Sequence, residues 1–193
     1  MNKVILTERF DRALAFAVHL HRHHTRKADG TPYIAHLLGV TALVLEDGGS
    51  EVEAIAALLH DAVEDQGGEA TRKAILEQFG EEVTAIVDGC TESMQTPKPP
   101  WRDRKQQYLQ NLRDANASVV RVSLADKLHN GRSLLFQLQR QGATVWRHFH
   151  QPPEDTLWFY RELLALYSQH SQSPQVEEFA GVVDAIAQFP PTS

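Results

Sequence analysis

The stretch that decides the interpretation of this chain is Leu58-Leu59-His60-Asp61-Ala62-Val63-Glu64-Asp65. It places His60 with Glu64, and Asp61 with Asp65, four residues apart on an otherwise apolar helix, so that the four polar groups share one broad face. Burying an imidazole and three carboxylates there would be costly unless each ion had a compensating partner. A bound cation is the simplest such partner, so the stretch indicates a metal site.

An isolated His-Asp pair also has a simpler interpretation, in which His60 is a core histidine with one hydrogen bond while Glu64 and Asp65 lie in water. Two further segments favour the metal site. His36 follows a polar loop that carries two cations, and Asp126 interrupts an apolar helical stripe much as Asp61 does. Together these segments complete a possible set of four ligands.

Apolar residues recur with a helical period along nearly the whole chain, and no segment alternates as a half-buried strand does. We therefore expect an all-α fold, with residues 1–193 forming a single domain. Three prolines within residues 93–100 predict an exposed loop. The expected helices span residues 7–24, 33–45, 50–65, 71–79, 82–91, 102–113, 117–140, 154–168 and 174–189.

Composition excludes several classes of protein. The formal charge of -6 argues against a nucleic acid polymer as the main partner, because such proteins usually carry a basic face. No apolar run approaches the ~20 residues that cross a bilayer, and the first residues lack a signal-peptide core. Cys90 is the only cysteine, so an intramolecular disulfide is impossible, and we interpret it as a packing residue. We expect a cytoplasmic protein without a membrane partner.

Three ordered phrases carry a resemblance to a known family. They run from Thr25-Arg26-Lys27 through Gly30-Thr31-Pro32-Tyr33-Ile34-Ala35-His36, from His60 to Asp65, and over Leu124-Ala125-Asp126-Lys127-Leu128-His129-Asn130. The order of these phrases resembles the HD superfamily of metal-dependent phosphohydrolases. The fuller motifs are most similar to the hydrolase domain of the RelA/SpoT alarmone enzymes, especially the free-standing small alarmone hydrolases. The resemblance implies an HD-domain helical bundle.

The resemblance also implies a metal cofactor and a catalytic pair. His36, His60, Asp61 and Asp126 would bind one divalent ion, which in these hydrolases is typically manganese. A mixed nitrogen and oxygen set suits manganese or another first-row ion, zinc included, better than calcium. Glu64 and Asp65 would orient the attacking water and handle its proton. Glu64 is favoured for the acid/base role, and a supporting role for Asp65 stays open.

The implied substrate is guanosine 3′,5′-bis(diphosphate), ppGpp. Attack by water at the 3′ phosphate would release the 3′ pyrophosphate as one unit and leave GDP. Arg26 would stack on the base and Lys27 would meet a phosphate, while Asn130 and Ser133 would contact the nucleotide from a later helix. The alternative for both cations is a solvated loop. The family often has a polar residue where this chain has Ala28, which weakens the expectation of guanine specificity.

Two other functions stay open. One is an HD-family nucleotidase or phosphatase for another nucleotide, such as an adenine alarmone, a 5′-nucleotide or a dinucleotide phosphate. The other is a non-catalytic nucleotide sensor, against which the intact pair Glu64 and Asp65 argues.

Several further side chains have simple interpretations. His129 is expected to make an internal hydrogen bond rather than to bind the metal. His19, His21, His23 and His24 fall on different faces of the first helix and are expected at its solvated end. Two interpretations are equally good for a group of residues after the proline loop: they form a cationic wall near the phosphates, or they belong to a plain amphipathic helix. These residues are Trp101, Arg102, Arg104, Lys105 and Tyr108.

Overall fold

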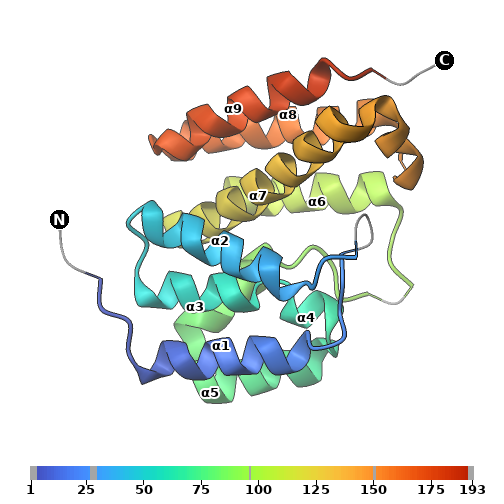
Figure 1. Cartoon of the computed structure of the whole chain (residues 1–193). Helices are drawn as coiled ribbons and strands as arrows, with labels where there is room; N and C mark the ends of the chain where they lie inside the picture. The colour runs from blue at the N-terminus through green and yellow to red at the C-terminus, as the bar shows by residue number, and fades with distance from the viewer. Residues whose placement is uncertain (1–3, 27–29, 96, 150, 191–193) are drawn as a thin grey trace.

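The computed structural model describes residues 4–26, 30–95, 97–149 and 151–190, which form a helical bundle (Figure 1). Within these ranges there is no β-strand, only an isolated bridge between Thr25 and Pro32, so the all-α prediction is confirmed. The elements are α1 (Glu8–Leu20), α2 (Ile34–Glu46), α3 (Glu51–Leu59), α4 (Ala62–Asp65), α5 (Gly68–Cys90), α6 (Trp101–Arg113), α7 (Ala117–Gln141), the 3-10 helix η1 (Gly142–His148), α8 (Pro153–His170) and α9 (Pro174–Ala187).

The long helix α7 lies at the centre of the bundle. It contacts α2, α3, α5, α8 and α9, and α1 joins the bundle through α3. Figure 1 shows α8 and α9 on one side of α7 and α2 on the other, with α1 and α5 farthest from α9. Buried apolar side chains from every α-helix form one continuous core, which extends from Ala13 to Ile186. The residues of α7 can therefore meet residues from most of the chain.

Local signals start the helices where the sequence indicates. The Thr7 hydroxyl accepts a hydrogen bond from the backbone N–H of Arg9 at the start of α1. Ser50 and Glu53 form a reciprocal capping box at the start of α3, in which each side chain accepts from the other residue's backbone N–H. These contacts satisfy donors that the first helical turn would otherwise leave unpaired. The predicted caps Thr7 and Ser50 are confirmed.

The first and third predicted helices have the wrong extent. The first ends at Leu20 instead of residue 24, because the chain turns there and the His24 N–H donates to the His21 carbonyl. The helix expected over residues 50–65 is interrupted at His60 and Asp61, which separate α3 from α4. The His60 ring takes the Ala57 carbonyl as its partner at 2.8 Å. The interruption therefore falls at two of the predicted metal ligands.

The predicted break at Gly80 is confirmed, although α5 begins earlier than expected, at Gly68. Gly80 has φ 76° and ψ 177°, a backbone conformation that residues with a Cβ rarely adopt. The kink divides α5 into two helical segments. The described parts of the predicted proline loop, residues 93–95 and 97–100, carry neither helix nor strand, as expected.

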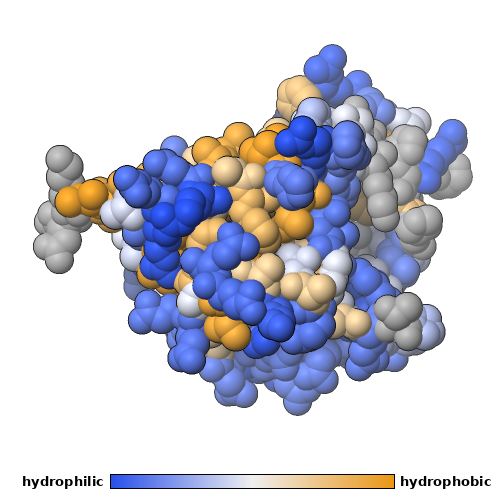
Figure 2. All heavy atoms as spheres, turned by 90° about the horizontal axis from the view of Figure 1, so that it is seen from below, coloured by the Kyte–Doolittle hydropathy of each residue, from blue (hydrophilic) through white to orange (hydrophobic). Residues whose placement is uncertain are grey.

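The segment before α1 projects from the body of the molecule, at the left of Figure 2 beside the grey N-terminal atoms. Its side chains Val4, Ile5 and Leu6 are exposed, and the Thr7 N–H ties its end to the Glu51 carboxylate at 2.5 Å. None of the helices in the described ranges is long and apolar enough to cross a bilayer.

Candidate metal centre

Three separate parts of the fold bring the four predicted metal ligands together. His36 comes from the first turn of α2, His60 and Asp61 from the break between α3 and α4, and Asp126 from the middle of α7. His36, His60 and Asp126 are buried, and one ligand atom from each lies within 4.8 Å of the others. The Asp61 Oδ2 atom lies 3.5 Å from His36 Nε2 and 3.0 Å from His60 Nε2.

Hydrogen bonding fixes which nitrogen of His60 faces this cluster. Its Nδ1 atom lies 2.8 Å from the carbonyl oxygen of Ala57, which can only accept, so Nδ1 carries the proton. The Nε2 atom is buried and has no hydrogen-bond partner. In the neutral imidazole, this atom points a lone pair toward the carboxylates of Asp61 and Asp126, at 3.0 and 3.6 Å. An unpaired buried acceptor of this kind is suited to a cation.

A second imidazole, that of His129, fixes which nitrogen of His36 faces the cluster. The His36 Nδ1 atom lies 2.9 Å from His129 Nδ1, and the Arg26 guanidinium reaches the same His129 atom at 3.4 Å. Because a guanidinium can only donate, His129 Nδ1 is the acceptor and His36 Nδ1 carries a proton. The His36 Nε2 lone pair therefore also faces the cluster. His129 makes the internal hydrogen bond that the sequence predicts.

The carboxylates of the cluster favour a positive charge at its centre. Burial disfavours the charged form of each carboxyl, yet His60 beside Asp61, and Lys127 beside Asp126, hold both carboxyl pKa values well below the usual range. Burial also opposes a charge on His60, but the two carboxylates raise its pKa well above the ordinary value, so they favour positive charge at Nε2, which a proton supplies when no metal cation is bound. Two imidazole nitrogens and an Asp126 oxygen thus lie close enough together to share a cation, and Asp61 Oδ2 lies beside both imidazoles.

A second layer of side chains holds the two carboxylates. The Tyr33 hydroxyl donates to Asp61 Oδ2 at 2.5 Å. Asp126 accepts from the Lys127 ammonium through Oδ2 and from the Asn130 amide through Oδ1, each at 2.5 Å. The positioning roles of Tyr33 and Lys127 were missed by sequence reasoning, although both lie inside the recognised phrases, beside or near a predicted ligand.

The histidines at the end of the first helix need a correction. His19 and His23 are exposed, as expected, but His21 is only 3% exposed. The rings of His21 and His24 stack on Tyr33, with centroid distances of 5.2 and 4.0 Å. Burial first, and then His24, lowers the pKa of His21 to about 4, so it packs as a neutral ring. Helix α1 ends early enough for this stack to form.

The predicted catalytic pair lines a pocket that also includes two of the predicted metal ligands. Its wall includes Glu64, Asp65, Asp61 and Asp126. The Glu64 carboxylate accepts from Lys98 Nζ at 2.6 Å and from the Glu92 backbone N–H at 3.0 Å. Asp65 keeps contact with solvent, but desolvation and then the charge of Asp61 raise its pKa above the usual value. Both carboxylates are therefore close to any molecule that approaches the cluster.

Cys90 also lines this pocket. Burial raises the pKa of its thiol far above neutral pH, so the group stays protonated and is unsuited to act as a nucleophile. This agrees with its interpretation as a packing residue.

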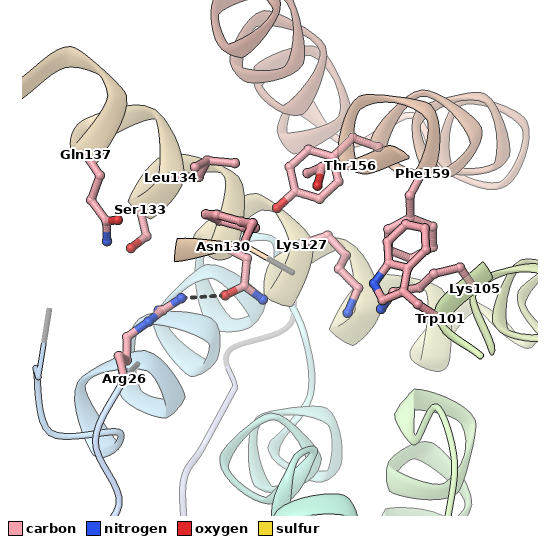
Figure 3. A pocket seen from close by; sticks show the side chains of 12 residues that line it. Arg26, Trp101, Lys105, Lys127, Asn130, Ser133, Leu134, Gln137, Thr156 and Phe159 are labelled. Atoms are coloured by element: carbon pink, nitrogen blue, oxygen red, sulfur yellow. Dashed lines mark hydrogen bonds between the residues drawn. The ribbon is translucent and has the colours of Figure 1, made fainter. Parts of the chain in front are cut away.

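A second pocket adjoins the first, and Lys127 and Asn130 line both. Figure 3 shows Arg26 pointing to Asn130, whose Oδ1 atom accepts from the guanidinium at 2.7 Å. Ser133 lies one helical turn farther along α7 on the same wall. Of the predicted substrate contacts, Arg26, Asn130 and Ser133 are thus brought together, whereas Lys27 lies outside the described residues, as does Ala28.

Some of the residues after the proline loop face the second pocket, as a cationic wall would, and others pack elsewhere on the helices. Trp101 and Lys105 line the second pocket, opposite Arg26 in Figure 3, and contribute a cation and an aromatic wall. Arg102 instead covers the Trp158 ring, and Arg104 pairs with Glu92. Only part of the predicted cationic wall therefore faces the pocket.

Comparison with known proteins gives consistent matches. A relative from Mus musculus, named guanosine-3′,5′-bis(diphosphate) 3′-pyrophosphohydrolase MESH1, is 37% identical over 125 residues, which are 63% of this chain and 67% of that protein. A probable guanosine-3′,5′-bis(diphosphate) 3′-pyrophosphohydrolase from Synechocystis is 37% identical over 128 residues. The aligned part is 64% of this chain but spans only 16% of that longer relative.

Structural comparison supports the same fold. A solved structure described as a metazoan ortholog of SpoT has a TM-score of 0.76 and 21% sequence identity, and the match covers 94% of this chain and 97% of that one. The family model described as the HD domain matches residues 13–152, which is more than half of the sequence and includes all four predicted ligands. The chain therefore belongs to the HD domain family.

Proposed function

We propose that this chain is a metal-dependent hydrolase of ppGpp that releases GDP and pyrophosphate. The observation that carries the proposal is the junction of the two pockets. Lys127 and Asn130 border both the buried His-Asp cluster and a cleft that holds Arg26 and aromatic side chains. A nucleotide in the cleft can present a phosphate to the cluster. The names of the relatives from Mus musculus and Synechocystis support this choice of nucleotide.

The proposed ligands of the metal are His36, His60, Asp61 and Asp126, and manganese is the proposed ion. The support is chemical, because both imidazoles present Nε2 lone pairs toward carboxylate oxygens in a buried cluster. When bound, such an ion supplies Lewis-acid activation of water and of a phosphoryl group. Lys127 and Asn130 hold the Asp126 carboxylate in place for it.

Glu64 and Asp65 are the proposed proton-handling pair. Water attacks the phosphorus attached to the 3′ oxygen, the bond between that phosphorus and the oxygen breaks, and the oxygen of GDP gains a proton. Glu64 is proposed to take the proton from the water, and Lys98 together with the Glu92 N–H keeps its carboxylate in one orientation. Asp65 is proposed to support this step from the same wall.

The proposed nucleotide contacts are Arg26 and Lys27 from the loop before α2, and Asn130 and Ser133 from α7. A planar guanidinium can stack on a purine, and an amide and a hydroxyl can bond to polar atoms of the ribose or base. Trp101 adds an aromatic face across the cleft from Arg26 (Figure 3).

The test is to incubate metal-stripped protein with ppGpp, with and without Mn²⁺, and to resolve the products by anion-exchange chromatography. The proposal predicts equal amounts of GDP and pyrophosphate, formed only when the metal is present. Bound Mn²⁺ without turnover of ppGpp would reject this substrate, and a panel of adenine and other nucleotides would then identify another one. Binding of ppGpp without turnover would indicate a sensor.

A further inference from the structure

The loop residue Arg26 is joined to two proposed metal ligands through two short chains of hydrogen bonds. One arm of its guanidinium, Nη2, donates to Asn130 Oδ1 at 2.7 Å, and the Asn130 amide donates to Asp126 Oδ1 at 2.5 Å. The other arm, Nη1, reaches His129 Nδ1 at 3.4 Å, and that atom lies 2.9 Å from His36 Nδ1. A residue in a loop thus contacts the supports of ligands on both α2 and α7.

The first chain determines the orientation of the Asn130 amide. An amide has a donor end and an acceptor end, and a guanidinium can bond only to the acceptor. Arg26 therefore turns the NH₂ group of Asn130 toward Asp126. The oxygen that receives this bond, Asp126 Oδ1, is also the one nearest the imidazoles, 3.3 Å from His36 Nε2 and 3.6 Å from His60 Nε2. The position of Asp126 Oδ1 therefore depends on the orientation of the Asn130 amide.

The second chain determines the tautomer of His36. With Arg26 donating to it, His129 Nδ1 acts as the acceptor, which leaves the shared proton on His36 Nδ1 and the lone pair on His36 Nε2. Without Arg26, His129 Nδ1 could carry a proton and His36 Nδ1 could accept it. His36 would then place N–H, instead of a lone pair, in the cluster.

We propose that Arg26 is a positioning residue of the metal centre, which fixes the Asn130 amide against Asp126 and the tautomer of His36 through His129. This goes beyond the proposed contact between Arg26 and the base, since it operates without nucleotide. Outer-layer hydrogen-bond partners of metal ligands change metal affinity about 10- to 100-fold in other proteins. The expected loss on removal of Arg26 is at the lower end, about tenfold, because its bonds reach the ligands through other residues.

Simple electrostatics predicts the opposite change in metal affinity when Arg26 is removed, so a measurement can distinguish the two explanations. Arg26 is a cation near a cation site, so its removal alone would reduce repulsion and tighten metal binding. The positioning role predicts that removal weakens binding. Arg132 provides a matched control, because it is another arginine close to His129 on α7, but its side chain pairs with Glu178.

The experiment measures the Kd for Mn²⁺ by isothermal titration calorimetry, without nucleotide, for the full chain and for the variants Arg26→Ala, Arg26→Lys and Arg132→Ala. We expect about a tenfold higher Kd for Arg26→Ala. Arg26→Lys should recover only part of the loss, because one ammonium cannot bond to both Asn130 and His129. Arg132→Ala should bind as tightly as the wild type or slightly tighter. An Arg26→Ala variant that binds Mn²⁺ as tightly as the wild type, or tighter, would overturn the inference.

Two additional readouts separate positioning from a general loss of structure. The visible absorption spectrum of the Co²⁺-loaded protein reports the ligand arrangement, and it should change in Arg26→Ala but not in Arg132→Ala. In a double-mutant cycle, Arg26→Ala combined with Asn130→Ala should weaken Mn²⁺ binding by less than the product of the two single effects. An unchanged spectrum together with fully multiplicative effects would overturn the inference. A wild-type chain that binds no Mn²⁺ would overturn the metal centre and the inference together.

Discussion

Gly39, one turn after His36 on α2, allows the His129 ring to approach the helix. A Cβ atom at this position would lie 2.3 Å from two atoms of that ring. The absence of a side chain on one helix therefore lets an imidazole from another support a proposed metal ligand. This close approach involves residues far apart in the chain, which is why no local pattern around Gly39 indicates it.

Gly39→Ala should displace His129 and weaken Mn²⁺ binding by about tenfold, as loss of an outer-layer partner does. Calorimetric titration of the metal measures the effect. Gly181→Ala on α9 is the matched control, because a Cβ there meets nothing within 4 Å. It should leave the metal affinity unchanged and stabilise the helix by roughly 0.5–1 kcal/mol. Equal metal affinities in the two variants would show that the His129 contact does not support the site.

The sequence predicted the four residues that meet at the cluster, but it did not predict the side chains that hold them in position. The motif identifies His36, His60, Asp61 and Asp126, and the structure brings them together. The support from Tyr33 to Asp61 joins residues 28 positions apart, and that from His129 to His36 joins residues 93 positions apart. Such contacts depend on how the helices pack against one another, and the periodic pattern of apolar residues in the sequence does not encode this packing.

At the scale of elements, the break between α3 and α4 was not predictable from the apolar pattern. Leu58, Leu59, Ala62 and Val63 are all buried, so the pattern continues across the break as if one helix were present. At the break the His60 ring bonds to the Ala57 carbonyl, a contact that the apolar pattern does not encode. The glycine-marked break in α5 was predictable, since the backbone of Gly80 needs a positive φ.

The capping box at the start of α3 should contribute measurably to stability. Ser50→Ala removes the side-chain acceptor for the Glu53 N–H and is expected to lower the free energy of unfolding by about 1 kcal/mol. Urea unfolding followed by circular dichroism measures this change. Metal affinity should be unaffected, because the cap lies at the opposite end of α3 from His60. A variant as stable as the wild type would show that other groups satisfy the helix terminus.

At the scale of the whole molecule, a second charged cluster links elements distant in the sequence. Arg121 on α7 donates to Asp47, the C-cap of α2, at 2.9 Å and to Glu53 on α3 at 2.5 Å. The hydroxyl of Ser173, the N-cap of α9, donates to the same Asp47. The network therefore connects four helices around the core.

The state of Glu53 makes this network sensitive to acid. Burial disfavours its charge, but the Ser50 N–H and Arg121 outweigh that effect and lower its pKa below the usual value of 4.5. A carboxyl whose pKa is lower in the folded state stabilises the fold above pH 4.5 and loses that contribution as the pH falls through the folded pKa. Glu53→Gln should therefore be less stable than the wild type at pH 7.

Thermal unfolding between pH 7 and pH 3 measures the difference. The gap in Tm between wild type and Glu53→Gln should narrow as the pH falls below 4.5, because the wild type alone loses this contribution. A gap that stays constant across this range would show that the charge on Glu53 does not stabilise the fold.

Removal of a proposed metal ligand and removal of a proposed proton-handling residue should have different effects. The most direct test loads Asp61→Ala and Glu64→Ala with Mn²⁺, quantifies the bound metal, and follows pyrophosphate release from ppGpp. Asp61→Ala should lose both metal and hydrolysis, whereas Glu64→Ala should keep the metal and lose most turnover, by about 10²-fold or more. A fully active, metal-loaded Asp61→Ala variant would show that Asp61 does not bind the metal on which hydrolysis depends.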